Sequence, residues 1–219
     1  MKYEIIGSSS KGNCIIVEDI LALDMGVSYS KVRKYLKKVK LVFISHVHTD
    51  HLNKTTIKQI VYNYPTIKFI CGSRDVLFKL LECNVIKKNI YFVEENKWHS
   101  LGILHFRLEP LFHDVQNYCI KVKFLAIDKK LIYIVDTNSV ENIEAKDYDL
   151  YLIESNYNTE LLEKHIQETE DVDRLYYLNR AKNTHLSAEQ CTDFLLANMG
   201  KNSEFLRIHK SSFNYEEVD

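Results

Sequence analysis

The chain has 219 residues, of which 46% are hydrophobic, and it contains only two prolines and six glycines. Such a chain can bury a substantial core, and its length predicts one compact domain over residues 1–219 rather than two full domains. The formal net charge is −1, so the overall charge neither requires nor excludes a polyanionic partner such as nucleic acid.

The five cysteines are scattered along the chain, and no two of them have the CxxC spacing. This pattern favours reduced, buried thiols over a disulfide framework or a zinc knuckle, and it indicates a reducing compartment. The N-terminal stretch MKYEIIGSSSKGN lacks an apolar signal core, and no apolar run approaches the roughly eighteen residues that a membrane helix needs. The sequence thus predicts a soluble cytoplasmic protein without a membrane partner.

The first elements of the chain are expected to be strands. Aliphatic and β-branched runs divided by turn residues predict antiparallel strands at residues 3–6, 14–19 and 20–24. A basic stretch with apolar residues at helical spacing then predicts a helix over residues 30–38. Its basic surface could attract phosphate, but a solvated helix face is the more ordinary interpretation.

A strand-and-helix pattern follows twice. The continuous apolar run LVFIS, residues 41–45, predicts a strand that is covered on both faces, and Asn53 is expected to cap the next helix. Residues 67–71 predict another strand, and Ser73 is expected to cap the helix after it. Two such units in succession imply helices packed over a sheet.

The second half is expected to begin with an antiparallel meander. Long strand-like runs lie at residues 103–112, 118–128 and 131–136, and a further buried strand is predicted at 149–155. Acidic helical segments come next. The stretch from residue 141 to residue 173 contains eleven acidic residues and two basic ones, so this surface should repel nucleic acid.

The last helix has clear boundary signals. Ser187 and Gln190 have the spacing of a capping box, and Gly200 is expected to end the helix. A final strand is predicted at residues 205–209.

The sequence HVHTDH, residues 46–51, places three histidines and one carboxylate between a buried strand and a helix start. Imidazole and carboxylate groups bind zinc and similar metals, and this mixture favours a catalytic site over a structural one. In an extended loop the side chains of His46 and His48 point one way, whereas Asp50 and His51 turn another way. One loop could therefore begin two metal sites, each of which needs further donors.

Further donors are expected where predicted strands or helices meet loops. His113 and Asp136 follow apolar strand-like runs, and His185 directly precedes the last predicted helix. Each of them alone could be an ordinary cap, turn residue or surface residue. Together with HVHTDH, the three are better interpreted as metal ligands.

The chain resembles the metallo-β-lactamase fold hydrolases, and it is most similar to the YycJ-like branch related to tRNase Z and to the PhnP-type phosphodiesterases. The resemblance extends over nearly the whole chain, through the segments GSSSKGN, LALDMG, LVFISHVHTDHL, LFHD, IYIVDTN, LIESNYN and LNRAKNTHLS. It implies an α+β fold, an αββα sandwich of two mixed sheets flanked by helices. This layout agrees with the order of elements predicted above.

The resemblance also implies a ligand set for two divalent metal ions, with zinc preferred and manganese as the alternative. One ion is assigned to His46, His48 and His113, the other to Asp50, His51 and His185, and Asp136 bridges them. A bridging hydroxide would attack a phosphodiester of DNA or RNA.

Three residues are expected to have catalytic roles. Asp50 and Asp136 would offset the metal charge and orient the nucleophile, while Asp24 and Ser45 would hold the imidazoles in the correct tautomer. His209 would protonate the leaving oxygen or bind phosphate, although an ordinary core histidine is an equal alternative.

Several alternatives stay open. The acidic segment and the short C-terminus suggest a phosphodiesterase for small cyclic or short nucleotides. The chain also departs from the family pattern at Tyr157, where the resemblance implies a histidine on the substrate side. Acyl chemistry on a thioester or β-lactam would use the same ligands, but it fits Asp50, Asp136 and the THLS motif less well. A catalytically silent metal-binding interaction module is disfavoured because all seven ligands are present. The sequence leaves a homodimer open.

Overall fold

The computed structural model describes residues 1–211, which form two six-stranded sheets and the helices around them. The first sheet contains, in order, β1 (Tyr3–Gly7), β2 (Cys14–Val17), β3 (Leu21–Leu23), β4 (Leu41–Phe43), β5 (Lys68–Cys71) and β6 (Ile90–Phe92). The second contains, in order, β12 (Glu204–Ile208), β11 (Leu150–Glu154), β10 (Lys129–Ile134), β9 (Asn117–Phe124), β8 (Leu104–Leu111) and β7 (Trp98–Leu101). Both sheets are mixed: β1–β3 and β7–β10 pair antiparallel, and β3–β6 and β10–β12 pair parallel.

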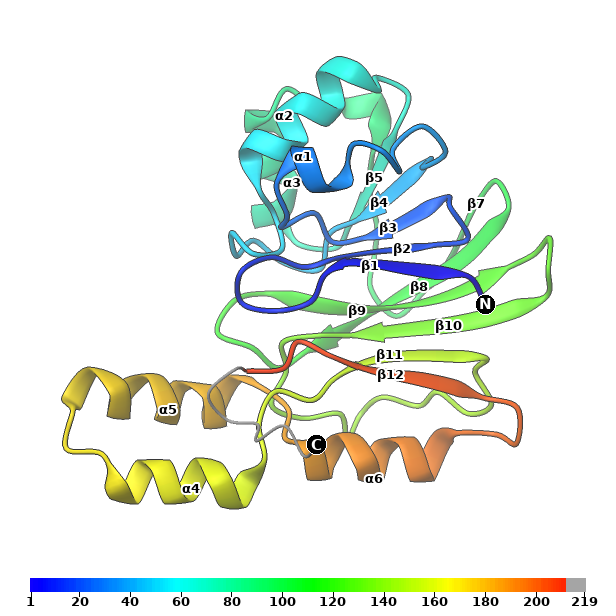
Figure 1. The fold of residues 1–219 in the computed structure, drawn as a ribbon. Coiled ribbons are helices and arrows are strands. Elements are labelled where there is room, and N and C mark those ends of the chain that lie inside the picture. The colour runs from blue at the N-terminus through cyan, green and yellow to red at the C-terminus, as the bar shows by residue number, and fades with distance from the viewer. Residues whose placement is uncertain (212–219) are drawn as a thin grey trace.

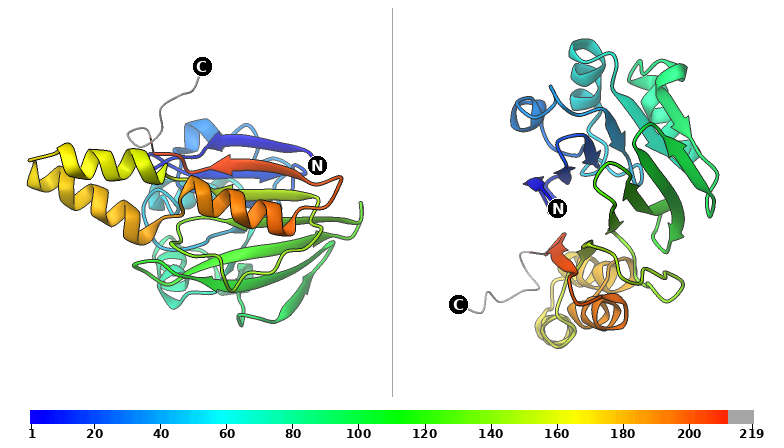
Figure 2. Two further views of the ribbon diagram at one scale, coloured as in Figure 1. Left: turned by 90° about the horizontal axis from the view of Figure 1, so that it is seen from below. Right: turned by 90° about the vertical axis from the view of Figure 1, so that its right-hand side faces the viewer.

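The helices form the two outer layers (Figure 1, Figure 2). The first sheet is covered by α1 (Tyr29–Val32), α2 (Lys54–Asn63) and α3 (Arg74–Glu82), and a short 3₁₀ turn, η1 (Lys87–Asn89), precedes β6. Along the second sheet lies α6 (Ala188–Asn198), whereas α4 (Thr159–Glu168) and α5 (Val172–Thr184) pack on each other and project beyond the ends of the strands. The α+β sandwich with two mixed sheets between helices is therefore confirmed.

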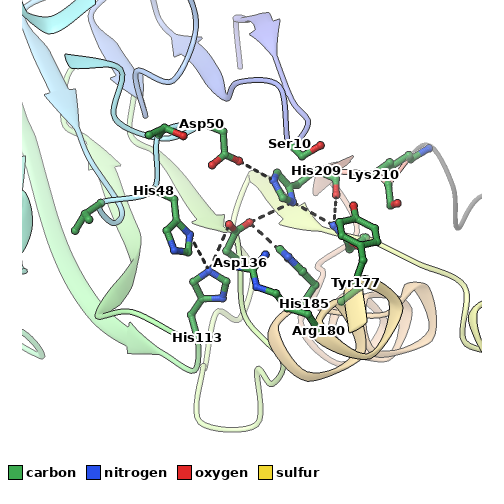
Figure 3. A pocket seen from close by; sticks show the side chains of 15 residues that line it. Ser10, His48, Asp50, His113, Asp136, Tyr177, Arg180, His185, His209 and Lys210 are labelled. Carbon is green, nitrogen blue, oxygen red and sulfur yellow. Dashed lines mark hydrogen bonds and ion pairs between the residues drawn. The ribbon is translucent and has the colours of Figure 1, made fainter. Parts of the chain in front are cut away.

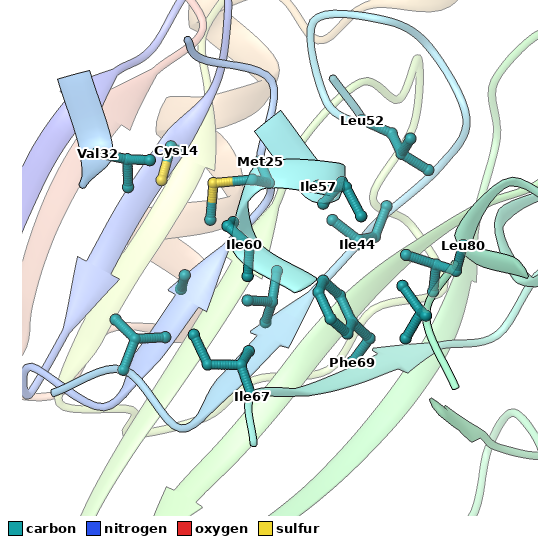
Figure 4. Close-up of a cluster of buried hydrophobic side chains, with 14 of the residues drawn as sticks. Cys14, Met25, Val32, Ile44, Leu52, Ile57, Ile60, Ile67, Phe69 and Leu80 are labelled. Carbon is teal, nitrogen blue, oxygen red and sulfur yellow. The ribbon is translucent and has the colours of Figure 1, made fainter. Parts of the chain in front are cut away.

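The alternation of side chains along each strand builds two separate cores. In β4, Val42 packs into the core under helices α1–α3, whereas Leu41 and Phe43 pack between the two sheets. Figure 4 shows the first of these cores, where Ile57 and Ile60 of α2 meet Ile44 and Phe69 of the sheet. Because both faces of the sheet are covered at β2, β3 and β4, these strands are continuous apolar runs.

The predicted helix caps are confirmed. Asn53 accepts a hydrogen bond from the Thr56 amide at 3.0 Å, and Ser73 accepts one from the Val76 amide at 3.1 Å. At the start of α6 the Ser187 and Gln190 side chains each accept a hydrogen bond from the other residue's amide. These side chains satisfy helix amides that have no partner within the helix.

The predicted helix over residues 30–38 is wrong in its length. The helix α1 ends at Val32, and residues 33–38 continue as turns, with the amides of Tyr35 and Lys38 bonded three residues back. Residues 30–38 carry five basic side chains, and like charges three or four residues apart destabilise a regular helix. Leu36 is buried all the same, so the apolar pattern indicated burial correctly but not the helix length.

The cysteines and the apolar character of the helices were also considered in the sequence. All five cysteines are buried and free, as predicted. Within residues 1–211, no helix combines the length and apolar character that crossing a membrane requires.

Candidate metal centre

The carboxyl ends of strands from both sheets meet at one edge, and the candidate ligands lie there. His46 follows β4 in the first sheet, and His113, Asp136 and His209 follow β8, β10 and β12 in the second. The strands β8, β10, β11 and β12 run in the same direction, so their carboxyl ends deliver side chains to the same side. Residues that are distant in sequence are thereby brought together (Figure 3).

A first group of four ligand atoms has the spacing of a tetrahedral metal site. His46 Nε2 lies 3.1 Å from His48 Nδ1, which lies 3.3 Å from His113 Nε2. Asp136 Oδ2 lies 3.4 Å from His46 Nε2 and 3.7 Å from His113 Nε2. Ligands held about 2.1 Å from a tetrahedral ion are separated by about 3.4 Å. The four atoms therefore surround a point that suits one ion.

A second group shares the same Asp136 oxygen. His51 Nε2 lies 3.2 Å from Asp136 Oδ2 and 3.3 Å from Asp50 Oδ2, and His209 Nε2 lies 3.6 Å from Asp50 Oδ2. These separations again suit ligands of one ion. Within residues 1–211, His209 Nε2 is buried without a hydrogen-bond partner, which is costly unless something else uses it. A metal ion would satisfy it.

A third cluster of Asp136, Glu154, His185 and His209 has a different geometry. His185 Nδ1 lies 2.6 Å from Glu154 Oε1, and His209 Nδ1 lies 3.1 Å from the same oxygen. A separation of 2.6 Å is too short for two ligands of one ion but is ordinary for a charge-assisted hydrogen bond. Glu154 therefore accepts hydrogen bonds from two imidazoles and fixes the orientation of both rings.

The positions of His185 and His209 differ from the ligand set that the resemblance implies. Asp50 and His51 share their group with His209, whereas His185 joins Glu154. His185 nevertheless lines the open cavity of the site. The sequence signal for His209 was its place directly after the last strand. Glu154 was missed as a functional residue, because a single acid at a strand end is commonly a turn or surface residue.

Asp24 orients the histidines of the loop after β4. This buried carboxylate accepts hydrogen bonds from the Ser45 amide and hydroxyl, from His51 Nδ1 at 2.7 Å and from the Tyr133 hydroxyl. Ser45 Oγ in turn lies 3.0 Å from His46 Nδ1. The contacts expected of Asp24 and Ser45 are thus present, and they turn Nε2 of His46 and His51 toward the ligand groups.

The backbone at the site is held in unusual conformations. Asp24, Asp136 and His209 have positive φ angles of 59°, 50° and 54°. Such angles are costly for residues with a side chain, and they cluster where the surrounding structure enforces them for function.

A close backbone approach also shapes the ligand loop. A Cβ atom on Gly26 would lie 1.6 Å from the Asp50 carbonyl oxygen, so only glycine fits beside this loop. The Asn13 amide donates to the same carbonyl at 2.7 Å, and the Met25 amide donates to the His51 carbonyl at 2.9 Å. These bonds fix the backbone that carries Asp50 and His51.

The buried charges shift the pKa values of the ligands in opposite directions. Burial and the neighbouring His51 lower the pKa of His46 to about 4, so its ring is neutral and can bind a metal. Burial alone lowers the pKa of His209, but the Asp136 carboxylate and other acidic neighbours outweigh it and raise the pKa to about 10. At His51, burial likewise lowers the pKa, but Asp136 and Asp24 outweigh burial and raise the pKa well above its ordinary value. Burial raises the pKa of Asp136, but His209 and His51 hold it well below the usual range.

The ligand groups form one wall of a cavity of about 410 Å³ (Figure 3). Its other walls come from Ser10, from residues 209–211 and from α5, which contributes Tyr177, Arg180 and Ala181. The site is therefore open to a ligand of moderate size. Tyr177 and Arg180 were not predicted from the sequence.

The comparisons by sequence give short matches only, and no protein-family model matches the chain. A segment of 93 residues, 41% of the chain, is 31% identical to cytidine monophosphate-N-acetylneuraminic acid hydroxylase of Cricetulus griseus. A segment of 105 residues is 30% identical to the inactive hydroxylase of that name in Homo sapiens. The chain covers only 16% and 21% of the lengths of these two proteins.

The comparisons by structure cover almost the whole chain. The metallo-β-lactamase fold protein YhfI of Bacillus subtilis has a TM-score of 0.69 at 14% identity, covering 97% of this chain and 88% of that one. The short form of human tRNase Z has a TM-score of 0.69 at 13% identity, with 97% and 93% covered. A diphosphatase from the PhnP family has a TM-score of 0.64 at 14% identity, with 98% and 88% covered. The chain has the metallo-β-lactamase fold.

Proposed function

We propose that this metallo-β-lactamase-fold protein is a hydrolase that uses two divalent metal ions to cleave phosphodiester bonds of nucleic acids or nucleotides. The observation that carries the proposal is the pair of ligand groups that share one oxygen of Asp136 beside an open cavity. Two of the structurally similar proteins are, by name, a tRNase and a diphosphatase.

In this proposal, His46, His48 and His113 would hold one ion and Asp50, His51 and His209 the other, and Asp136 belongs to both groups. His209 thus replaces His185 in the ligand set implied by the resemblance. Imidazole and carboxylate donors at tetrahedral spacing favour zinc, and manganese is the alternative. When bound, such a pair of ions activates water and neutralises charge on the attacking and leaving oxygens of a phosphodiester.

The protein itself supplies the proton for the leaving oxygen through His185, the role first considered for His209. Its Nδ1 donates to Glu154, so Nε2 is the nitrogen available to a substrate in the cavity. Burial lowers the pKa of His185, but the Glu154 charge and hydrogen bond outweigh burial and raise it. The raised pKa favours the imidazolium form more than in a free histidine, as a general acid requires.

The remaining site residues have charge-balancing and orienting roles. Asp50 and Asp136 stay ionised, because hydrogen bonds and charges from His51 and His209 hold the pKa of each carboxyl below its usual range despite burial. Their negative charge offsets that of the ions and orients the attacking water. Five free, buried thiols suit a reducing compartment, so we assign the enzyme to the cytoplasm.

A second candidate function is hydrolysis of short or cyclic nucleotides rather than polymers. The acidic residues of the 141–173 segment include Glu160, Glu163 and Glu168 on α4 and Asp171 and Asp173 at the start of α5. The helix α5 also forms a wall of the cavity. A long polyanion that extended along this helix to residues 168–174, of which four are acidic and one is basic, would meet like charge.

The test is hydrolysis of bis(p-nitrophenyl) phosphate, duplex DNA, single-stranded RNA and cyclic nucleotides in zinc and in manganese. His48→Ala serves as the inactive control. Turnover of polymers that disappears in this variant supports the nuclease, and turnover of small diesters alone supports the second candidate. No turnover of any substrate, with two metal ions bound, would instead favour the catalytically silent metal-binding module.

A further inference from the structure

The side of the cavity formed by α5 has features that the metal chemistry does not use. Tyr177 and Arg180 lie three residues apart, and both line the cavity together with Ala181 on the next turn. The Tyr177 residue is 44% exposed and the Arg180 side chain is 39% exposed, so both can contact a molecule bound in the cavity. Figure 3 shows them beside the ligand residues.

Arg180 is held close to the first ligand group by an acidic neighbour. Its Nη2 donates to Asp114 Oδ2 at 2.6 Å, and Asp114 Oδ1 lies 3.1 Å from His113 Nε2 and 3.4 Å from His48 Nε2. This arrangement places a guanidinium group next to the ligands and reduces the number of rotamers that it can adopt. The planar guanidinium has further donors that suit phosphate oxygens.

Tyr177 offers a different kind of contact. An exposed aromatic ring stacks on a nucleobase of any sequence, and such stacking is a main source of affinity for single-stranded nucleic acid. An aromatic ring one helical turn from a guanidinium matches the chemistry of one nucleotide, which has a base and a phosphate.

We propose that Tyr177 and Arg180 form a binding subsite for the nucleoside next to the scissile phosphate, with Tyr177 stacking on its base and Arg180 binding its phosphate. The proposal rests on the phosphodiesterase function above and names the part of the substrate that α5 recognises.

The charge at the far end of α5 limits the subsite to about one nucleotide. Residues 168–174, where α4 ends and α5 begins, contain four acidic residues and one basic residue, Arg174. Nearer the cavity, Glu163 of α4 is paired with Lys182 of α5 at 2.9 Å, and Arg180 borders the cavity itself. A second or third nucleotide that reached residues 168–174 would therefore meet a net negative surface.

Isothermal titration of the zinc-loaded protein with thymidine 5′-monophosphate and with inorganic phosphate tests the base contact. We expect the nucleotide to bind at least about 10-fold more tightly than phosphate. Tyr177→Ala should remove this difference without changing the affinity for phosphate, and Tyr177→Phe should retain it. Equal nucleotide affinity in the wild type and in Tyr177→Ala would overturn the proposal.

Arg180→Ala should weaken both nucleotide and phosphate by about 10-fold, because a charged hydrogen-bonding partner is lost. Arg180→Lys should recover only part of this affinity, because an ammonium group lacks the planar fork. Tyr176→Ala and Arg174→Ala are matched controls: Tyr176 is 73% exposed on the same helix, and neither residue lines the cavity. If either control weakened binding as much as the test variant of its type, the subsite would be wrongly assigned.

The number of nucleotides in the bound molecule provides the second test. The trinucleotide pTpTpT should bind within about 3-fold of the mononucleotide, whereas a stepwise rise in affinity with each nucleotide would contradict a one-nucleotide subsite. Hydrolysis of bis(p-nitrophenyl) phosphate in the same preparations separates the two proposals. If that diester is cleaved but thymidine 5′-monophosphate binds no better than phosphate, the subsite fails and the proposed function stands. If nothing is cleaved and the Tyr177-dependent affinity is present, the subsite stands and the hydrolytic function fails.

Discussion

His185 and His209 both donate from Nδ1 to Glu154, yet their surroundings differ. His209 is almost completely buried, and its Nε2 lies beside Asp50, whereas the His185 side chain is partly exposed and lines the cavity. One carboxylate thus orients two imidazoles for different tasks. The role of each histidine depends on what its second nitrogen can reach.

This difference leads to opposite results for two alanine variants. His209→Ala should lower the bound metal from two ions toward one, because it removes a ligand of the second group. His185→Ala should keep two ions and lower kcat by about 10²- to 10⁴-fold, as expected for loss of a general acid. Metal analysis and kinetics of both variants provide the check; normal metal content in His209→Ala together with metal loss in His185→Ala would reverse the assignment.

Protonation of His209 predicts a pH dependence of metal binding. Its pKa in the folded, metal-free protein is raised to about 10, so the ring carries a proton at pH 7 that a metal ion must displace. Zinc affinity should therefore rise with pH between 6 and 8, with release of at least one proton per protein. Titration calorimetry in two buffers of different ionisation enthalpy measures this release, and buffer-independent heats would contradict it.

The same shift affects the stability of the metal-free protein with the opposite sign. The folded protein binds the His209 proton more tightly than the unfolded chain, whose pKa is about 6.5. This contribution to the free energy of unfolding is complete below pH 6.5 and is lost as the pH rises toward 10.

At the scale of elements, the ligand loop after β4 depends on its contact with the segment after β3. A Cβ atom on Gly26 would overlap the Asp50 carbonyl, so Gly26→Ala must displace the loop that carries Asp50 and His51. We expect the free energy of unfolding to fall by about 4 kcal/mol, which is in the upper range for single substitutions. We also expect the second ion to bind more weakly.

Gly102→Ala is the control for this variant. Gly102 has a positive φ angle, which Gly26 does not, but nothing lies within 4 Å of its added Cβ. Its substitution should cost only about 1 kcal/mol and leave metal binding unchanged. Denaturant unfolding compares the two, and equal losses would show that the overlap of the Gly26 Cβ with Asp50 costs no more than the backbone strain at Gly102.

The elements themselves were predictable to different degrees. The helices α2, α3 and α6 begin where their capping residues predict, because a cap is a local interaction between neighbouring residues. The length of α1 was not predictable from apolar spacing alone, since repulsion among basic residues and packing of Leu36 against the core decide it. The short strands β6 and β7 were missed, β6 because it is only three residues long and β7 because polar residues interrupt it.

At the scale of the whole molecule, the site is assembled from the strand ends of both sheets. His46, His48 and His51 were recognisable because they share one short segment of sequence. The grouping of Asp50 with His209 was not, because it depends on the parallel placement of β12 beside β11. The residues of α5 at the cavity had no signal at all, since an exposed tyrosine and arginine on a helix are ordinary surface residues.

Because the ligands come from both sheets, bound metal should stabilise the whole fold. At a free metal concentration 1,000 times the dissociation constant, binding adds about 4 kcal/mol to the free energy of unfolding. For a chain of this length that corresponds to a rise in Tm of about 10 °C. Thermal unfolding before and after treatment with a chelator measures it, and an unchanged Tm would contradict metal binding between the sheets.

The proposed enzyme needs two ions bound around Asp136 for phosphodiester hydrolysis. The most direct measurement is a stepwise titration of metal-depleted protein with zinc, following hydrolysis of bis(p-nitrophenyl) phosphate after each addition. We expect little activity up to one equivalent, a rise to the maximum at two, and no activity at any equivalent for Asp136→Ala. Full activity at one equivalent, or none at two, would contradict the claim.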